Sequence, residues 1–174
     1  MYFTNQQQVI RWYPEDFPIQ IFMDEDLPAP RVRQLRAAVT HWNEQVGCTA
    51  FRVTRFIQPF SLLGSRPPQA TVVVVEGDIP DHELEPANSL MGYARLLWKG
   101  NHFTHAYVAI DVAVASFEGK TVFVHELGHV LGLRHDSEIE SIMHQYAVRS
   151  GKIIQQDDLD FVRWEMNCDY QEGS

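Results

Sequence analysis

The most constraining feature of this sequence is the segment from His125 to His135, which reads His-Glu-Leu-Gly-His-Val-Leu-Gly-Leu-Arg-His. Residues four positions apart lie on the same face of an α-helix, so His125 and His129 can direct both imidazoles at one point. Gly132 can adopt a positive φ, end such a helix and turn the chain back, which would let His135 add a third imidazole. The sequence therefore predicts a buried helix followed at once by a sharp turn.

Three imidazoles directed at one point are typical of a zinc site. A structural zinc ion usually has four protein ligands, whereas a catalytic one has three and keeps one position open. Glu126 directly follows the first histidine, so it can lie beside the metal without coordinating it, where a general base takes a proton from a zinc-bound water. We predict one catalytic Zn²⁺ held by His125, His129 and His135, with Glu126 as the catalytic base. The alternative is that the first two histidines are ordinary core residues of an amphipathic helix.

Composition limits the class of protein further. The chain has 174 residues, a hydrophobic content of 45% and a formal net charge of -9. This length fits one domain over residues 1–174 with a sizeable core, and we expect a monomer. The acidic balance argues against a nucleic-acid partner, and the short aliphatic runs argue against a membrane span. The N-terminal residues lack the pattern of a secretory signal, so the location stays open.

Hydrophobic periodicity predicts an α+β fold. Residues 31–46 carry one apolar stripe at helical spacing, and residues 71–75 are apolar on both faces, as in a central strand. The complete prediction is strands at 17–23, 50–57, 71–75, 91–97 and 106–114, and helices at 31–46, 120–131 and 156–166. This order indicates a mixed five-stranded sheet with about three helices packed on it.

The zinc motif and the later segment Ser141-Ile142-Met143-His144 together resemble the metzincin clan of zinc peptidases, most closely its matrixin (matrix-metalloproteinase-like) family. The resemblance implies a twisted sheet, an active-site helix, a Met-turn in which Met143 lies under the zinc, and a C-terminal helix. It implies an upper part at about 1–135 and a small lower part at about 136–174. The implied activity is that of a zinc-dependent endopeptidase acting on a peptide or protein substrate. The alternative is a zinc-containing binding or structural module without turnover.

Several positions depart from the matrixin pattern. Asp136 stands where typical matrixins have Ser, and we expect it either to bond the backbone near the Met-turn or to be exposed. The astacin-type tyrosine would stand where this chain has Gln145, so Tyr146, one residue later, is a candidate oxyanion contact or pocket wall. No cysteine-switch propeptide is recognisable. A disulfide between Cys48 and Cys168 is one alternative, but we expect two free thiols.

Weaker patterns concern substrate binding. In metzincins an edge strand pairs antiparallel with the extended substrate, and residues 90–96 are the candidate for it here, because strand addition binds peptide backbone. Gly92, Tyr93 and Ala94 are then candidate substrate contacts, and the alternative is an ordinary edge strand. Residues 144–154 would line the pocket for the side chain after the scissile bond.

Two other groups of polar residues contain side chains that can bind metals. One is an acidic run, which fits either a Ca²⁺ site or, as we favour, a solvated loop. The other is a pair of histidines three residues apart, which we expect to be structural or surface residues rather than ligands of a second metal. The acidic run consists of Glu76, Asp78, Asp81, Glu83 and Glu85, and the pair of His102 and His105.

Overall fold

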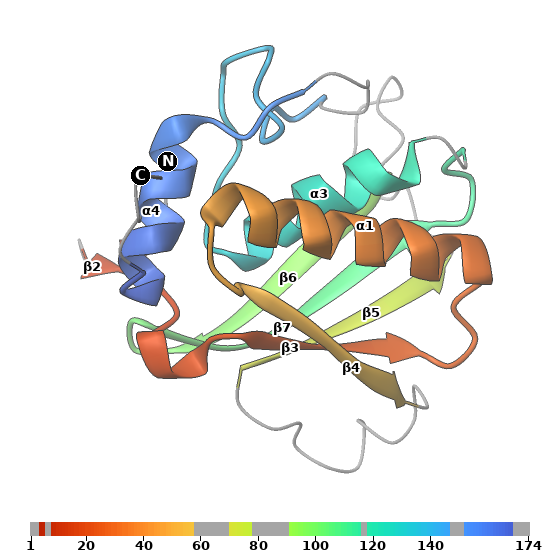
Figure 1. The fold of residues 1–174 in the computed structure, drawn as a ribbon, viewed down its shortest axis with the longest axis horizontal. Coiled ribbons are helices and arrows are strands. Elements are labelled where there is room, and N and C mark those ends of the chain that lie inside the picture. The colour runs from red at the N-terminus through yellow and green to blue at the C-terminus, as the bar shows by residue number, and fades with distance from the viewer. Residues whose placement is uncertain are drawn as a thin grey trace.

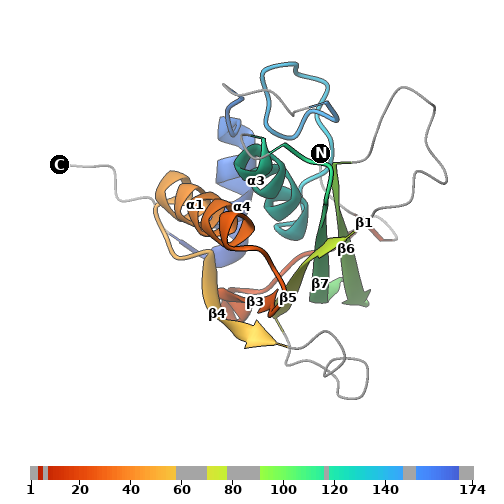
Figure 2. The ribbon, with the colours of Figure 1, turned by 90° about the vertical axis from the view of Figure 1, so that its right-hand side faces the viewer.

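A computed structural model of the chain describes residues 4–5, 8–57, 70–77, 91–115, 118–146 and 152–168. They form a sheet with the helices on one of its faces, as Figure 1 and Figure 2 show from two sides. The elements are β1 (Thr4–Asn5), β2 (Gln8–Val9), the 3-10 helix η1 (Pro14–Asp16), β3 (Ile19–Asp24), α1 (Ala29–Val46), β4 (Phe51–Ile57), β5 (Thr71–Gly77), β6 (Gly92–Lys99), β7 (His102–Asp111), α3 (Gly119–Val130) and α4 (Gln156–Met166).

The main sheet has the strand order β4-β3-β5-β7-β6. Neighbouring strands are parallel except β6 and β7, which are antiparallel. The strand β5 is central and its residues Val72 and Val74 are fully buried, as the apolar run predicted. The strand β6 lies at the edge of the sheet, so one side of its backbone has no partner strand in the described part of the chain. The predicted mixed five-stranded α+β fold is confirmed.

The strand β7 differs from its predicted range of 106–114. It begins at His102 and ends at Asp111. In its first residues, buried Phe103 alternates with the partly exposed His102 and Thr104. Such alternation is typical of a half-buried strand, but a search for continuous apolar runs misses it. The sequence prediction therefore started the strand four residues too late.

Two buried tryptophans hold helix α3 in place. Trp42 on α1 donates from Nε1 to the carbonyl of Val124 at 2.8 Å, and Trp12 donates from Nε1 to the carbonyl of Val130 at 2.6 Å. Val130 is the last residue of α3, where carbonyls have no partner within the helix. Both tryptophans are fully buried, so these bonds are shielded from water. They set the position of α3 between α1 and the N-terminal segment.

Buried Arg31, near the start of α1, holds the loop between β7 and α3. Its Nε donates to a carboxylate oxygen of Glu76 at 2.6 Å, and its Nη2 donates to the carbonyl of Val114 at 2.8 Å. No basic partner for Glu76 was expected from the sequence, because Arg31 lies 45 residues earlier and reaches it only through packing of α1 on the sheet. The rest of the acidic run, Asp78, Asp81, Glu83 and Glu85, lies outside the described residues.

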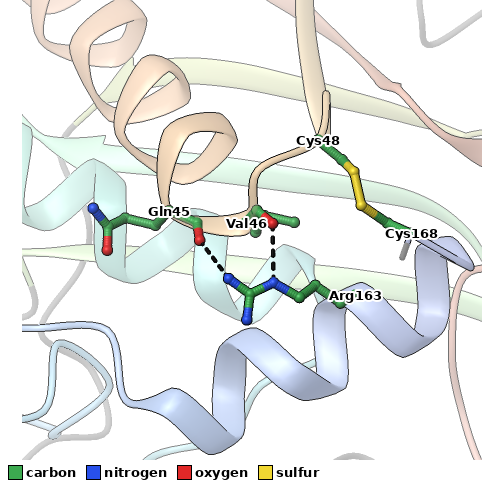
Figure 3. The surroundings of a disulfide bond; sticks show 5 residues. All are labelled: Gln45, Val46, Cys48, Arg163 and Cys168. Atoms are coloured by element: carbon green, nitrogen blue, oxygen red, sulfur yellow. Dashed lines mark hydrogen bonds between the residues drawn. A yellow bond between two sulfur atoms is a disulfide. The ribbon is translucent and has the colours of Figure 1, made fainter. Parts of the chain in front are cut away.

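Cys48 and Cys168 form a disulfide, so the expectation of two free thiols was wrong. Cys48 follows the end of α1 and Cys168 follows the end of α4, 120 residues later (Figure 3). Arg163 on α4 donates to the carbonyls of Gln45 and Val46 at 2.9 and 3.0 Å, at the C-terminal end of α1. A cation is favourable there because of the helix dipole. This contact joins the two helix ends, and sequence spacing alone could not show it.

Replacing both cysteines by serine should destabilise the protein by about 2–5 kcal/mol, because the disulfide closes a very long loop in the unfolded chain. Urea unfolding of the wild type and of the Cys48→Ser/Cys168→Ser variant measures the difference. Wild type in excess reductant should approach the variant. Equal stability of oxidised wild type and the variant would contradict a stabilising disulfide.

A second prediction concerns Glu165 on α4, which is fully buried. Its Oε1 accepts a hydrogen bond from the backbone N–H of Trp12 at 3.2 Å, but its Oε2 has no hydrogen-bond partner. Burial raises its pKa well above the ordinary value, although the Trp12 hydrogen bond opposes this. The unfolded chain ionises first, so this group's contribution to stability is complete below the ordinary pKa and is lost as the pH rises toward the folded pKa.

The Glu165→Gln variant should therefore gain stability relative to wild type as the pH rises above about 4, the ordinary pKa of a glutamate. Denaturant unfolding at several pH values measures the difference, and Glu140→Gln on the exposed surface is the control. A stability difference that stays constant with pH would show that Glu165 ionises alike in the folded and unfolded states.

Candidate metal centre

Helix α3 and the turn after it bring three histidines together. His125 and His129 lie on α3, His135 follows in the next loop, and their candidate ligand nitrogens are all within 4.8 Å of one another. Within the described residues they form the only such group of three or more His, Cys, Asp or Glu side chains. The first two are half-buried and His135 is exposed, so the group opens to solvent on the side of His135.

The turn that brings His135 back depends on Gly132. Its φ is +84°, a left-handed conformation that favours glycine. The N–H of Gly132 donates to the carbonyl of His129 at 2.9 Å, and the N–H of Leu133 donates to that of Gly128 at 3.1 Å. These two bonds form a Schellman motif, which ends the helix and reverses the chain. The predicted stop at Gly132 is confirmed.

Two backbone carbonyls fix the orientation of the helical histidines. The Nδ1 of His125 lies 2.6 Å from the carbonyl oxygen of Ile142, and the Nδ1 of His129 lies 2.8 Å from that of Leu133. A carbonyl oxygen only accepts, so each Nδ1 must carry the hydrogen. In a neutral imidazole each Nε2 is then left with a lone pair. Metal-binding histidines are commonly held this way by a partner on the other ring nitrogen.

The distance between the two Nε2 atoms shows whether these residues can bind one metal ion. The Nε2 atoms of His125 and His129 are 3.1 Å apart. Neither has a hydrogen to share, so they repel unless a cation lies between them. Two nitrogens bound tetrahedrally to zinc at its usual bond length lie about 3.3 Å apart. With His135 as third donor, the group suits a zinc ion with one open position.

Burial keeps the ligand candidates neutral. It lowers the pKa of His125 to about 4 and that of His129 to about 3. His135 is more exposed, but partial desolvation, followed by the nearby positive charges of His144 and Arg134, lowers its pKa as well. Only the neutral imidazole binds a metal, so this environment favours ligation.

Glu126 lies on the same helix and is buried. Its Oε2 has no hydrogen-bond partner, and burial raises its pKa to about 8. A nearby cation would oppose this shift, because it favours the charged form. The residue after the ligand candidate His125 is thus a buried carboxyl with one oxygen that has no hydrogen-bond partner.

Met143, the predicted Met-turn residue, packs against Gly128 on α3. It is fully buried, and its sulfur occupies the space next to Gly128, where no side chain would fit. Its N–H donates to the Ser141 hydroxyl at 3.0 Å, and its carbonyl accepts from the Asp136 N–H at 2.9 Å. Asp136 thus bonds the Met-turn through its backbone, while its carboxylate accepts from the N–H of Glu138 at 3.1 Å.

The candidate substrate contacts lie in different environments. On β6, Gly92 is buried, Tyr93 is 41% exposed and Ala94 is half-buried. Tyr146 is 50% exposed and its ring centroid lies 5.6 Å from that of His144. Its role stays a prediction. In the segment 144–154, residues 147–151 lie outside the described residues.

The other histidine pair lies apart from the metal group. The Nε2 of His102 is 2.6 Å from a carboxylate oxygen of Asp16, and its ring packs on Tyr13 with the centroids 4.3 Å apart. His105 is buried in the sheet. Among the described residues, neither belongs to a group of three or more potential metal ligands.

Comparisons with known proteins identify a matching family and similar folds. The family model of the matrixins matches residues 76–164, just over half of the chain. Archaemetzincin from Methanopyrus kandleri has a similar structure, with a TM-score of 0.60, 14% identity, and 85% of this chain and 94% of that chain covered. The hatching-enzyme zinc-protease HCE-1 from the medaka fish Oryzias latipes gives a TM-score of 0.56, 13% identity and coverage of 97% and 100%. At such identities these two show the fold alone. No match was found among curated protein sequences.

Replacing His135 by alanine should weaken zinc binding by more than the roughly 10–100-fold typical of losing a residue that merely supports a ligand. Competition with a chelator of known affinity measures the change. His144→Ala is the matched control, because His144 is a neighbouring histidine outside the group of three. Unchanged affinity in His135→Ala would exclude His135 as a ligand.

Proposed function

The chain belongs to the matrixin family of zinc peptidases, and on this premise we propose that it is a zinc-dependent endopeptidase acting on peptides or proteins. The observation that carries the proposal is the 3.1 Å distance between the Nε2 atoms of His125 and His129, neither of which carries a hydrogen. Among the described residues, no helix has the length and apolar character to cross a membrane.

The proposed role of each residue follows from the chemistry of its side chain. His125, His129 and His135 hold the ion, and the carbonyls of Ile142 and Leu133 keep two of the rings oriented. When bound, zinc acidifies a water molecule and polarises the carbonyl of the scissile bond. The neutral imidazoles leave the net positive charge of the ion uncompensated, which strengthens both effects.

Glu126 is the proposed proton carrier. It takes a proton from the attacking water and passes it to the nitrogen of the departing amine, so one carboxyl serves both halves of the hydrolysis. Its Oε2 has no hydrogen-bond partner in the protein. No described protein group therefore competes with the water for this oxygen.

The edge strand β6 is the proposed site for the substrate backbone. It pairs with β7 on one side, antiparallel, and has no described strand on the other. An extended peptide can add to such an edge by backbone hydrogen bonds alone. This mode of binding demands few particular side chains, so it suits cleavage of varied unfolded segments.

Zinc content and proteolysis of wild type and Glu126→Ala together test the proposal. We expect about one zinc ion per chain in both proteins, as for a three-ligand catalytic site, and cleavage of unfolded casein by wild type only. Glu140→Ala, an exposed glutamate beyond the metal group, is the control and should keep full activity.

Each other result has a distinct meaning. Bound zinc without cleavage by wild type would favour a zinc-containing binding or structural module. Cleavage by Glu126→Ala at the wild-type rate would remove Glu126 from the proposed mechanism. Absence of bound zinc in wild type would refute the metal site itself.

A further inference from the structure

The strand β6 and the helix α3 touch at Gly92. Gly92 is buried and pairs with Ile110 on β7. A Cβ added at Gly92 would point toward α3. A Cβ placed there would lie 3.0 Å from Oε1 of Glu126 and 2.9 Å from Cγ1 of Val122. It would also lie 3.1 Å from the carbonyl oxygen of Ala109. Three neighbouring groups therefore leave no room for a side chain at Gly92 unless one of them moves.

Two of these three neighbours cannot easily move. Val122 is β-branched and lies on a helix, where its side chain has one strongly preferred rotamer. The carbonyl of Ala109 belongs to the backbone of β7 inside the sheet. The carboxyl of Glu126 is the end of a longer side chain, so it gives way first. A side chain at Gly92 would thus displace the group that we propose as the catalytic base.

We propose that Gly92 is a positioning residue: its missing side chain seats the carboxyl of Glu126 directly against the backbone of β6. The inference rests on the proposed function, because it concerns the base of that reaction. The same strand is the proposed binding site for the substrate backbone, so Gly92 sets how far the base lies from the bound peptide. This role differs from the direct substrate contact predicted from the sequence.

A size series at position 92 tests the proposal, with the variants Gly92→Ala and Gly92→Val. The matched controls are Gly77→Ala and Gly77→Val on the neighbouring part of the sheet. Gly77 also lies in a strand, β5, but a Cβ there would meet no atom within 4 Å. The readouts are kcat and KM for one peptide, zinc content, melting temperature and a crystal structure of each Gly92 variant.

We expect kcat to fall with side-chain size, by about 100-fold for Gly92→Val, because displacing a catalytic group by about 1 Å can cost that much. KM should change by less than about threefold, and zinc content should stay at that of wild type, because the three histidines are not displaced. In the crystal, the Glu126 carboxyl should lie farther from β6. The Gly77 variants should match wild type throughout.

Removing the contact with Val122 should restore part of the activity that Gly92→Ala loses. In Gly92→Ala/Val122→Ala the smaller helix residue makes room, so kcat should recover toward that of Val122→Ala alone. A raised KM with unchanged kcat would instead assign Gly92 to substrate binding and overturn the proposal. So would a Gly92→Val structure with Glu126 in its wild-type position. If wild type proves inactive, the proposed function fails, whereas the crystal structures still decide whether Gly92 seats Glu126.

Discussion

The candidate metal centre depends on two hydrogen bonds from imidazoles to backbone carbonyls. The bonds of His125 to Ile142 and of His129 to Leu133 determine which ring nitrogen carries the hydrogen. They leave the two Nε2 atoms without hydrogens and 3.1 Å apart, an arrangement that a cation bound to both would stabilise. The site is thus prepared for a metal by the backbone of the loops after α3, and not by the three histidines alone.

Contacts elsewhere in the fold hold helix α3 and the loops after it in place relative to each other. Indole groups of Trp12 and Trp42 bond carbonyls of α3, and Met143 packs under Gly128 on the same helix. A disulfide between Cys48 and Cys168 links the C-terminal ends of α1 and α4. Each contact joins segments distant in sequence, so the position of the site is a product of tertiary packing.

The sequence predicted what depends on local spacing and periodicity. The helix of His125 and His129, the stop at Gly132 and the central strand β5 follow from residues close together in the chain. The disulfide, the Arg31–Glu76 ion pair and the contact of Gly92 with Glu126 were not predicted, because each needs two elements to pack first. The carbonyl of Ile142 lies 17 residues from His125, so no helical pattern indicates it.

A crystal structure with anomalous scattering at the zinc edge would show how the two helical imidazoles are oriented around the metal. We expect one zinc ion bound by Nε2 of His125 and of His129, with Nδ1 of His125 still donating to the carbonyl of Ile142 and Nδ1 of His129 to that of Leu133. Zinc bound through Nδ1 of either residue, or zinc bound elsewhere on the chain, would contradict it.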